Sequence, residues 1–421
     1  MRILVLTINY WPEQTGIGAV ITRRCEYLAS LGHEVIVCTG MPYYPEWKVD
    51  QKYSGRLFVR EEYNGVSILR TWIWVPKKVT SMKRVLFESS FLATSLVNAV
   101  RQSAPDLLIS VSPPLGLGLS AIFLKRLLRL PYIFDVEDLQ PDAAADLGML
   151  PPRVLPWLYR IESAAYRHAE LITTVTEGMR RKIISKGISS DRVFALPAAA
   201  DNNFFAIKHS GAAQTFREKH GLRGKFCVVH SGNMGVKQGL DVVLDAALLT
   251  RDNPQMVYLL VGDGVMKQHL TRRVEALSLD NVKFLPVQAH SEFIDMLGAI
   301  DTALVVQQAS VSDTAFPSKT VTLLSAARPV VASVSESSEV GQVIQQSKAG
   351  VVIESENAEL LATTLQDLFK NPSRRLAMAE CGRNYALTHW HQDRVFSALE
   401  SYVLMARAAK AHCEEIHVPA A

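Results

Sequence analysis

The chain has 421 residues, of which 48% are hydrophobic and 20% are charged, and its formal net charge is +4. This length favours two domains over one, and this composition excludes a disordered chain. The small net charge gives no reason to expect nucleic acid as a partner. The five cysteines are odd in number and lack CxxC spacing, which argues for a reducing compartment and against a zinc site.

The chain opens on MRILVLTINY, which resembles a β-strand rather than a signal peptide. No apolar run approaches the roughly 20 residues that a membrane-spanning helix needs. We therefore expect a cytoplasmic protein that could lie on a membrane.

Short apolar runs alternate with helical patterns in the first half of the chain. The helical spacing that begins at Ile21 ends before Gly32, which stands where a left-handed C-cap belongs. The strand-like runs are residues 4–8, 35–39, 107–112, 132–136, 171–176 and 193–196. Strands that alternate with helices predict a parallel sheet covered by helices on both faces.

The alternation stops near Pro197, and residues 198–213 are expected to form a linker. It then restarts, with strand-like runs at residues 226–229, 256–261, 282–284, 302–306, 330–333 and 351–353. We thus expect two doubly wound, Rossmann-like α/β domains, residues 1–200 and 201–388. A C-terminal helix within residues 389–421 is expected to pack back on the first domain. Ligands of such sheets bind outside the carboxyl ends of the strands, so facing domains would share one cleft.

Both halves place glycines in a loop between a strand and a helix. Residues 230–241, HSGNMGVKQGLD, follow one apolar run directly. Backbone N–H groups in such a loop are expected to cradle a phosphate. Gly16 and Gly18 stand in the corresponding loop of the first half, but Ile21 occupies the third glycine position of a dinucleotide fingerprint. This departure, and the missing acidic ribose ligand, disfavour a nicotinamide oxidoreductase.

The second half supplies the stronger candidates for a ligand. Gly232, Gly235 and Gly239 accompany Lys237, and residues 262–264 form a glycine-flanked turn that lets a ring approach the backbone. For each motif the alternative is a turn without a ligand and a solvated lysine.

Two helix starts in the same half also carry suitable polar groups. Ser318 and Lys319 open one helix, where a lysine is unfavourable unless an anion is bound. Residues 335–339, SESSE, begin another helix. They either contact a hydroxyl-rich ligand or serve as an ordinary serine N-cap with acids in the first turn.

Residues 134–138, FDVED, place three carboxylates at a strand end. Carboxylates in such a cluster repel one another and need a metal, a cation or a hydroxyl-rich ligand as partner. Asp142 and Asp146 follow at spacings that fit a helix N-terminus better than a metal cage. We favour hydroxyl recognition or general-base work, with a helix-cap role for at least one of the three.

An aromatic and basic region follows the second strand. Residues 43–47 and 72–74 supply aromatic surface, and residues 75–78 and 83–84 supply cations. With the apolar residues 87–97 they resemble a patch for the membrane interface. The alternative is that residues 87–97 form a core helix.

Together these stretches resemble a known family along residues 1 to about 400. The matching stretches are INYWPEQTGIG, MPYYPEWKV, DVEDLQPDAAADLG, IESAAYRHAELITTVTEGM, HSGNMGVKQGLDVVLDAA, LVGDG, FPSKTVTLLSAARPVVAS and SESSEV. They resemble the two-domain glycosyltransferases of the GT-B fold in retaining family 4. The nearest branch makes bacterial exopolysaccharide and O-antigen and includes the colanic acid fucosyltransferase.

The resemblance implies that the first domain binds a glycan acceptor and the second a nucleotide-diphosphate sugar, which is a substrate. Glu137 and Asp138 match the residues beside the reacting carbon and would be catalytic. The implied donor-binding residues are Gly16, Gly18, Gly232, Asn233, Gly235, Lys237, Gly262, Asp263, Gly264, Ser318, Lys319, Thr322, Ser335, Glu336 and Glu339. No cofactor and no metal is expected, since cationic side chains and a helix N-terminus stabilise the leaving diphosphate in this fold.

The sequence departs from the family at several of these positions. Asn233 and Gln238 stand where the family has basic residues around the glycine loop. Thr314 and Thr322 replace its paired glutamates, and Ala327 replaces its helix-ending glycine. The expected function is still hexosyl transfer with retention to a lipid-linked glycan, in cell-surface polysaccharide synthesis. The alternatives are a non-catalytic nucleotide-sugar-binding partner of a transferase and a nucleotide-sugar epimerase.

Overall fold

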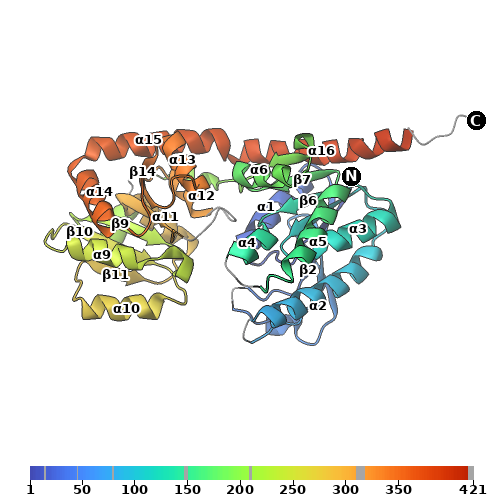
Figure 1. Ribbon diagram of the computed structural model, residues 1–421, viewed down its shortest axis with the longest axis horizontal. Helices are drawn as coiled ribbons and strands as arrows, with labels where there is room; N and C mark the ends of the chain where they lie inside the picture. The colour runs from blue at the N-terminus through green and yellow to red at the C-terminus, as the bar shows by residue number, and fades with distance from the viewer. Residues whose placement is uncertain are drawn as a thin grey trace, which may run out of the picture. The chain divides into compact units, whose positions relative to one another are not determined.

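The computed structural model describes residues 1–13, 16–44, 46–77, 80–146, 150–207, 211–309 and 318–415. The chain divides into two compact units. The first contains Met1–Pro197 and Val395–Ala421, and the second contains Ala198–Arg394 (Figure 1).

The first unit is built on an eight-stranded sheet in the order β3-β4-β2-β1-β5-β6-β7-β8. Its strands are β1 Arg2–Leu6, β2 Glu34–Gly40, β3 Phe58–Tyr63, β4 Val66–Thr71, β5 Leu107–Ser112, β6 Tyr132–Val136, β7 Leu171–Thr174 and β8 Val193–Ala195. Apart from the antiparallel β3–β4 pair, the strands run parallel. The chain winds outward from β1 in one direction and then from β5 in the other, so the switch point lies between β1 and β5.

The second unit is built on a six-stranded parallel sheet in the order β11-β10-β9-β12-β13-β14. Its strands are β9 Phe226–Ser231, β10 Met256–Val261, β11 Val282–Leu285, β12 Thr302–Val306, β13 Val330–Ser333 and β14 Gly350–Ile353. The two doubly wound α/β domains predicted from the alternation of strands and helices are therefore confirmed. The central strands are continuous apolar runs because helices cover both of their faces.

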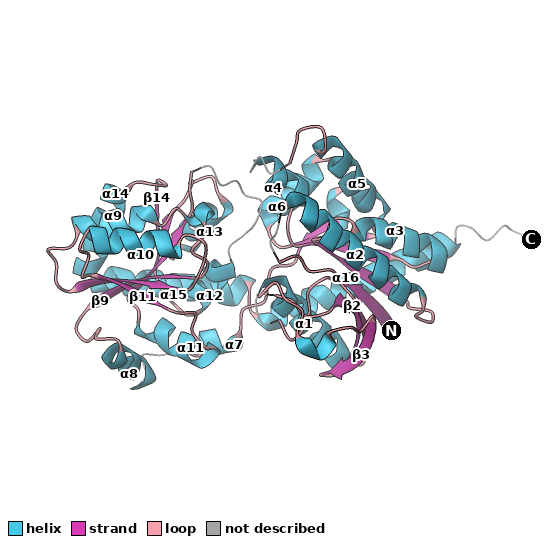
Figure 2. Cartoon of the chain, turned by 90° about the horizontal axis from the view of Figure 1, so that it is seen from below, coloured by secondary structure: helices cyan, strands magenta, loops and turns pink. Residues whose placement is uncertain are grey.

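Helices flank both sheets (Figure 2). Those of the first unit are α1 Gly16–Ser30, α2 Ser81–Val100, α3 Leu117–Leu128, α4 Gln140–Asp146, α5 Leu155–His168, α6 Glu177–Ser185 and α16 Gln392–Glu415, with short 3₁₀ turns η1 Gln51–Tyr53 and η2 Ser190–Arg192. Those of the second unit are α7 Asn202–Phe205, α8 Gly211–Lys219, α9 Asp241–Leu249, α10 Lys267–Ala276, α11 His290–Ala299, α12 Ser318–Ser325, α13 Glu339–Ser347, α14 Ala358–Lys370 and α15 Pro372–His389, with the 3₁₀ turn η3 Val236–Gln238.

Helix α16 belongs to the first unit, although it follows the second unit in the sequence. Its Phe396 stacks on Tyr27 of α1 with ring centroids 4.8 Å apart, and its Tyr402 stacks on Phe194 of β8 at 4.7 Å. Val403 is fully buried. The apolar face of this helix therefore completes the core of the first unit.

Two segments differ from what the sequence predicted. The β3–β4 hairpin was not predicted, although its turn is Asn64-Gly65, both with positive φ. The segment 198–213 is not a simple linker, because α7 buries Phe204 and Phe205 in the core of the second unit. Burial of these two large apolar side chains stabilises the folded second unit, so the segment does not remain a solvated linker.

Strands β9 and β10 end in glycine loops that pack directly against each other. Gly232 N–H donates to the Val261 carbonyl at 2.9 Å, and Met234 N–H donates to the Asp263 carbonyl at 2.8 Å. Gly262 has φ 138°, and a Cβ placed on it would lie 2.0 Å from the Gly232 carbonyl oxygen. Only glycine at position 262 allows the two loops to meet.

We expect Gly262→Ala to lower the free energy of unfolding by about 3 kcal/mol or more, because it adds a backbone clash to an unfavourable φ. The matched control is Gly224→Ala, where φ is 69° but no atom lies within 4 Å of a Cβ. The control should cost only about 1 kcal/mol. Urea unfolding curves measure both changes, and equal losses would show that the contact between the loops is not the cause.

Candidate active site

A cavity of about 260 Å³ lies at the switch point of the first sheet, where β1, β2 and β5 end. Its lining residues are Ile8, Asn9, Gly16, Ile17, Tyr43, Tyr44, Trp47, Arg84, Phe87, Glu88, Pro113 and Pro114. The rings of Tyr43, Trp47 and Phe87 contact one another with centroids 5.0 to 5.5 Å apart. The cavity therefore combines aromatic faces with hydrogen-bonding side chains, as sugar-binding sites do.

Glu13 fixes the shape of this cavity and was not predicted from the sequence. One of its carboxylate oxygens accepts hydrogen bonds from the backbone N–H groups of Tyr43 and Tyr44, at 3.1 and 3.0 Å. The other accepts from Asn9 Nδ2 at 2.7 Å. Burial raises the pKa of Glu13 above its ordinary value, while these hydrogen bonds oppose the shift. Glu13 thus connects the loop after β2 (the aromatic loop), which carries Tyr43 and Tyr44, to Asn9 near the end of β1.

The two glycines predicted in the first half lie at the start of α1. Gly16 has φ 63° and lines the cavity. A Cβ on Gly18 would lie 3.3 Å from both the Cβ and the carbonyl oxygen of Glu13. The absence of a side chain on Gly18 therefore gives Glu13 the room to pack where it holds the aromatic loop.

The carboxylates at the end of β6 have a cation as partner, which was one of the predicted alternatives. Arg24 of α1 places its Nη1 atom 2.7 Å from both Asp135 Oδ2 and Glu137 Oε1. Its Nη2 atom donates to the Leu196 carbonyl, and Thr173 Oγ1 donates to Asp135 Oδ1 at 2.6 Å. Arg24 lies more than a hundred residues from these acids in the sequence, so local spacing could not identify it.

One guanidinium cannot neutralise two carboxylates. Burial raises the pKa of Glu137 to about 7, even though Arg24 lowers it. The third acid, Asp138, is partly exposed and lies two residues before α4, and its backbone carbonyl accepts from Gln140 N–H at 3.0 Å. Residues 137 and 138 are both of intermediate exposure, but the ion pair with Arg24 involves Asp135 and Glu137.

Asp142, in the first turn of α4, is paired with Lys186. Asp146 is the last residue of α4, and its side chain is outside the described part. Among the residues that the structure describes, no three His, Cys, Asp or Glu side chains gather in a way that could hold a metal ion.

In the second unit, Lys319 of α12 lies beside the paired glycine loops. Its Nζ atom is buried, has no hydrogen-bond partner among the described residues, and is 4.0 Å from where a Cβ on Gly232 would be. Burial lowers the pKa of Lys319 to about 8. The neighbouring His230 is fully buried, and burial holds its pKa well below the ordinary value. A buried ammonium without a partner makes this position suited to an anion.

The glycine loop after β9 is not the open cradle of N–H groups that the sequence predicted. Besides the bonds of Gly232 and Met234 to the next loop, Gly235 N–H donates to Gln238 Oε1 at 3.1 Å. These groups cannot bind a phosphate at the same time. Any anion here must therefore be met mainly by side-chain cations and by the start of α12.

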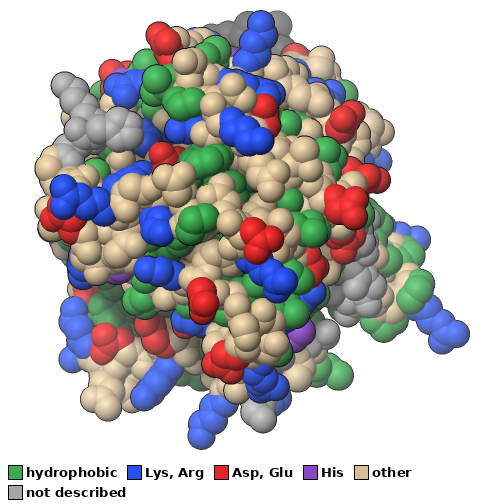
Figure 3. Space-filling view, turned by 90° about the vertical axis from the view of Figure 1, so that its left-hand side faces the viewer, with side chains coloured by type: hydrophobic (Ala, Val, Ile, Leu, Met, Phe, Trp, Pro, Cys, Tyr) green, Lys and Arg blue, Asp and Glu red, His purple; other side chains and the backbone are tan. Residues whose placement is uncertain are grey.

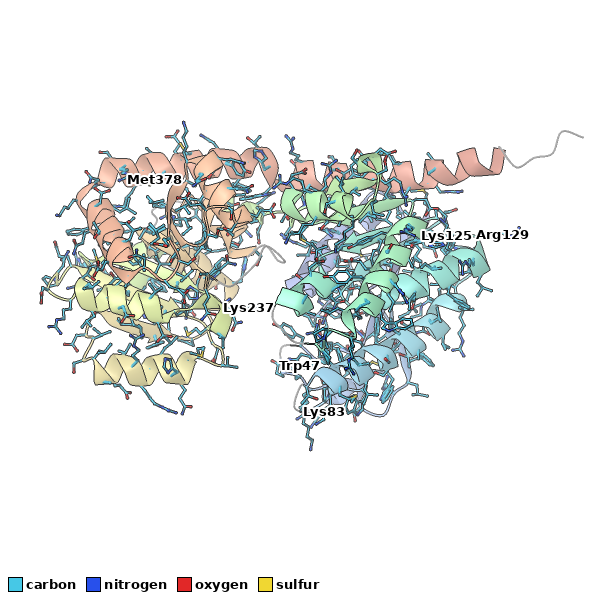
Figure 4. The ribbon with its side chains drawn as sticks, in the orientation of Figure 1. Trp47, Lys83, Lys125, Arg129, Lys237 and Met378 are labelled. Atoms are coloured by element: carbon cyan, nitrogen blue, oxygen red, sulfur yellow. The ribbon has the colours of Figure 1, made fainter. Side chains whose placement is uncertain are left out.

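The other predicted donor-binding residues lie around Lys319 or near the ends of other strands. Asn233 is exposed in the loop after β9, and Lys237 is exposed on η3 (Figure 4). A Cβ on Gly264 would lie 2.6 Å from Asn233 Oδ1, so these two loops are in contact. Asp263 is exposed, and its Oδ1 accepts from Gly264 N–H at 2.8 Å.

Helix α12 carries two more of the predicted residues. Ser318 is exposed at its first position, and Thr322 lies one turn later and is partly buried. Thr314, which stands in place of a family glutamate, lies outside the described residues.

The helix expected from the SESSE segment, α13, begins at Glu339. Ser338 is the N-cap of α13, and its hydroxyl accepts from Gly341 N–H at 3.0 Å. Glu339 is in the first turn, while Ser335 and Glu336 lie in the exposed loop before it. The serine N-cap alternative is therefore confirmed for Ser338. Ser335 and Glu336 are left exposed at the carboxyl end of β13.

We expect the free energy of unfolding to depend on Glu137 between pH about 4.5 and about 7. A carboxyl with a raised pKa binds its proton more tightly in the folded state, so folding loses stability as pH rises through this window. Glu137→Gln should remove this loss, which is at most about 3 kcal/mol. Urea unfolding at pH 5 and pH 8 measures it. The exposed Glu275→Gln is the control, and an unchanged pH slope in Glu137→Gln would contradict the assignment.

Comparison with known proteins agrees with this architecture. Residues 15–199 match the family model for the glycosyl transferase 4-like domain, and residues 213–385 match that for glycosyl transferases group 1. The chain is 30% identical to WcaI of Escherichia coli K12, named as a colanic acid biosynthesis glycosyl transferase, over 90% of this chain and 95% of that protein. It is 24% identical to a GDP-mannose-dependent phosphatidylinositol monomannoside mannosyltransferase of Mycolicibacterium smegmatis, over 63% of this chain and 75% of that enzyme.

Solved structures share the fold. Anabaena HepE in complex with UDP superposes with a TM-score of 0.72 at 16% identity, covering 96% of this chain and 99% of that one. Sucrose-phosphate synthase from Thermosynechococcus elongatus gives 0.74 at 14% identity, covering 97% and 100%. With the family models and the relationship to WcaI, this places the chain in the family 4 glycosyltransferases of the GT-B fold.

Proposed function

We propose that this chain transfers a hexosyl group from a nucleotide-diphosphate sugar to a lipid-linked glycan, with retention at the anomeric carbon. The observation that carries the donor half of the proposal is the buried ammonium of Lys319 beside the joined glycine loops, which has no hydrogen-bond partner in the part of the chain that the structure describes. Solved structures of HepE hold UDP and UDP-glucose, which supports a nucleotide sugar here.

On this proposal the second unit binds the donor. Lys319 meets the diphosphate, Lys237 adds a second cation from η3, and Ser318 stands in the first turn of α12, whose N–H groups point toward an anion at the helix start. The turn from Gly262 to Gly264 receives the nucleoside, and Ser335, Glu336 and Glu339 contact the sugar. No metal is needed in this scheme, because cationic side chains stabilise the charge that develops on the leaving diphosphate.

The first unit binds the acceptor in the cavity at its switch point. Tyr43, Trp47 and Phe87 present apolar ring faces to a sugar, and Asn9 and Glu88 supply hydrogen bonds to hydroxyl groups. The name of the mycobacterial relative describes an acceptor that is a glycosylated lipid, which supports a lipid-linked glycan. WcaI is named for colanic acid biosynthesis, which supports a place for this chain in bacterial polysaccharide synthesis. We propose that the chain acts at the cytoplasmic face of the inner membrane.

The two carboxylates predicted to be catalytic have different surroundings. Arg24 holds Glu137, so we assign Glu137 to positioning the strand end. Asp138, the next residue, is partly exposed, and we assign it to orienting the acceptor hydroxyl. That hydroxyl oxygen bonds to the anomeric carbon as the bond to the diphosphate breaks, and its proton passes to the departing phosphate oxygen.

We expect Lys319→Ala to weaken binding of UDP or GDP about tenfold or more, because a charge-assisted contact is lost. In the wild type, affinity should fall as pH rises through about 8, since only the ammonium form attracts the anion. The variant should lack this dependence. Isothermal titration across pH 7 to 10 measures both effects, with the exposed Lys370→Ala as control. Unchanged affinity in Lys319→Ala would remove the lysine from the site.

We expect Asp138→Asn to keep donor affinity but to lose transfer by about a hundredfold or more, since the amide accepts a weaker hydrogen bond and no longer orients the acceptor hydroxyl for attack. Transfer from a nucleotide-sugar panel to an undecaprenyl-diphosphate-linked glycan measures it, with the exposed Asp191→Asn as control. Wild-type transfer by Asp138→Asn would contradict the role. Turnover of donor without acceptor would instead indicate an epimerase, and transfer seen only with a second protein would indicate a non-catalytic partner.

A further inference from the structure

One wall of the acceptor cavity is helix α2, and the core holds it in place. No helix in the described ranges is long and apolar enough to cross a membrane. Helix α2 packs on the core, where Phe87 and Phe91 are buried, so the alternative that residues 87–97 form a core helix is confirmed for this side. Because Phe87 also lines the cavity, this wall is fixed by the core of the first unit.

Another part of the cavity wall comes from two loops. The loop after β1 contributes Asn9 and carries Glu13, and the aromatic loop, which runs from β2 to η1, contributes Tyr43, Tyr44 and Trp47 (Figure 4). Glu13 joins the two loops to each other, but it lies in a loop itself. The position of this joined pair relative to the sheet therefore depends on other contacts.

Arg70, on β4, contacts both loops from the sheet. Its Nη2 atom donates to the Trp11 carbonyl, in the loop after β1, at 2.7 Å. Its guanidinium carbon lies 5.8 Å from the Trp11 ring centroid and 5.3 Å from that of Tyr53, the last residue of η1. Both distances are within the range of a cation–π contact. One side chain therefore links the sheet to the loop of Glu13 and to the far end of the aromatic loop.

Glu61, on the adjacent strand β3, is the acid that accompanies Arg70. It accepts a hydrogen bond from Arg70 Nε, and it also accepts from the Tyr53 hydroxyl at 3.0 Å and from Lys52 Nζ at 2.9 Å. Burial would raise the pKa of Glu61, but these hydrogen bonds outweigh burial and lower that pKa to about 2. The carboxylate is therefore charged at neutral pH and holds Tyr53 beside Arg70.

Trp11 is the residue at which the β3–β4 hairpin meets the loop after β1. Its ring stacks on Tyr63 of β3, with centroids 4.1 Å apart and 16° between the ring planes. Its N–H donates to Thr22 Oγ1 of α1 at 3.0 Å. Because Glu13 follows two residues later, the position of Trp11 determines where the carboxylate that holds the aromatic loop can lie.

The burial of Arg70 favours a role in geometry over a role in stability. The face of the molecule drawn in Figure 3 intersperses exposed cations with acids, and exposed pairs contribute little. Arg70 is fully buried, and its Nη1 atom has no hydrogen-bond partner among the described residues. A buried ion pair is often no more stabilising than apolar side chains of the same size, whereas its hydrogen bonds are directional.

We propose that Arg70 is a positioning residue for the acceptor, because through Trp11 and Tyr53 it holds the two loops at the spacing that the acceptor sugar requires. This role rests on the proposed function in one respect, the assignment of the acceptor to this cavity. Arg70 is not among the residues that line the cavity, so it acts through the loops and touches no substrate.

The test measures acceptor KM, kcat and UDP affinity in the full chain. Arg70→Lys keeps the charge that Glu61 needs, but it lacks the planar fork that binds Glu61 and the Trp11 carbonyl together. We expect it to raise the KM for an undecaprenyl-diphosphate-linked glycan about tenfold, with kcat changed by about twofold at most, since the loops bind the acceptor and take no part in bond breaking. UDP affinity should stay at the wild-type value.

A second variant keeps the test valid if Arg70→Lys is unstable. Glu61→Met with Arg70→Met removes both charges of the buried pair, so no charge is left unpaired and the chain should still fold. It loses the bond to the Trp11 carbonyl and should raise the acceptor KM by the same factor. The matched control is Arg192→Lys in the same unit, at a partly buried arginine that donates to backbone carbonyls at the end of α5. The control should keep the wild-type KM.

Hydrogen exchange supplies a measurement that needs no acceptor. The amides of Tyr43 and Tyr44 donate to Glu13, so they should be protected in the wild type. Both Arg70 variants should exchange them faster, about tenfold, because the loops open more often. Wild-type exchange rates at these two amides would overturn the proposal whichever glycan is the acceptor.

Trp47→Ala separates this proposal from the proposed function, because it removes a ring that lines the cavity. A raised KM in Trp47→Ala with a wild-type KM in both Arg70 variants would overturn the positioning role alone. A wild-type KM in all three would remove the acceptor from this cavity, and the positioning role with it. An equal rise in KM in Arg192→Lys would assign the effect to general destabilisation and would also overturn the role of Arg70.

Discussion

The buried ammonium of Lys319 is the group on which the proposed donor site depends. Among the described residues this cation has no hydrogen-bond partner, and its burial opposes folding and lowers its pKa. The proposed site depends on Gly262, because a Cβ there would lie 2.0 Å from the Gly232 carbonyl oxygen and would keep the two loops apart. On the proposed function, an anion that enters relieves an unfavourable state of the free protein and binds more strongly than surface lysines would allow.

Much of the fold could be predicted because its central strands are buried on both faces and read as short apolar runs. The β3–β4 hairpin was not predicted, because β3 is an edge strand that is nowhere fully buried and has the polar sequence FVREEY. The turn dipeptide Asn64-Gly65 was the available indication, because both residues need positive φ in a tight hairpin. Hydrophobic periodicity is therefore least informative at the edge of a sheet.

The candidate site was predictable at the level of residue types but not of partners. The sequence indicated that the acids at the end of β6 needed a counter-charge. Arg24 reaches them only because the sheet order places α1 beside that strand end. Glu13 was missed for a related reason, since its hydrogen bonds go to a loop thirty residues away. Ala327 adopts φ 53°, so the position still needs the conformation that the family's glycine provides, at about 1 kcal/mol of strain.

The place of α16 affects the order in which the protein can fold. During synthesis, the segments that bury Phe396, Leu399 and Val403 emerge from the ribosome only after the whole second unit has been made. Until then, the surface of the first unit that α16 covers, with Tyr27 and Phe194, is exposed to water. The first unit therefore cannot complete its packing during synthesis until α16 has emerged, and before that it exposes apolar surface that a chaperone could bind.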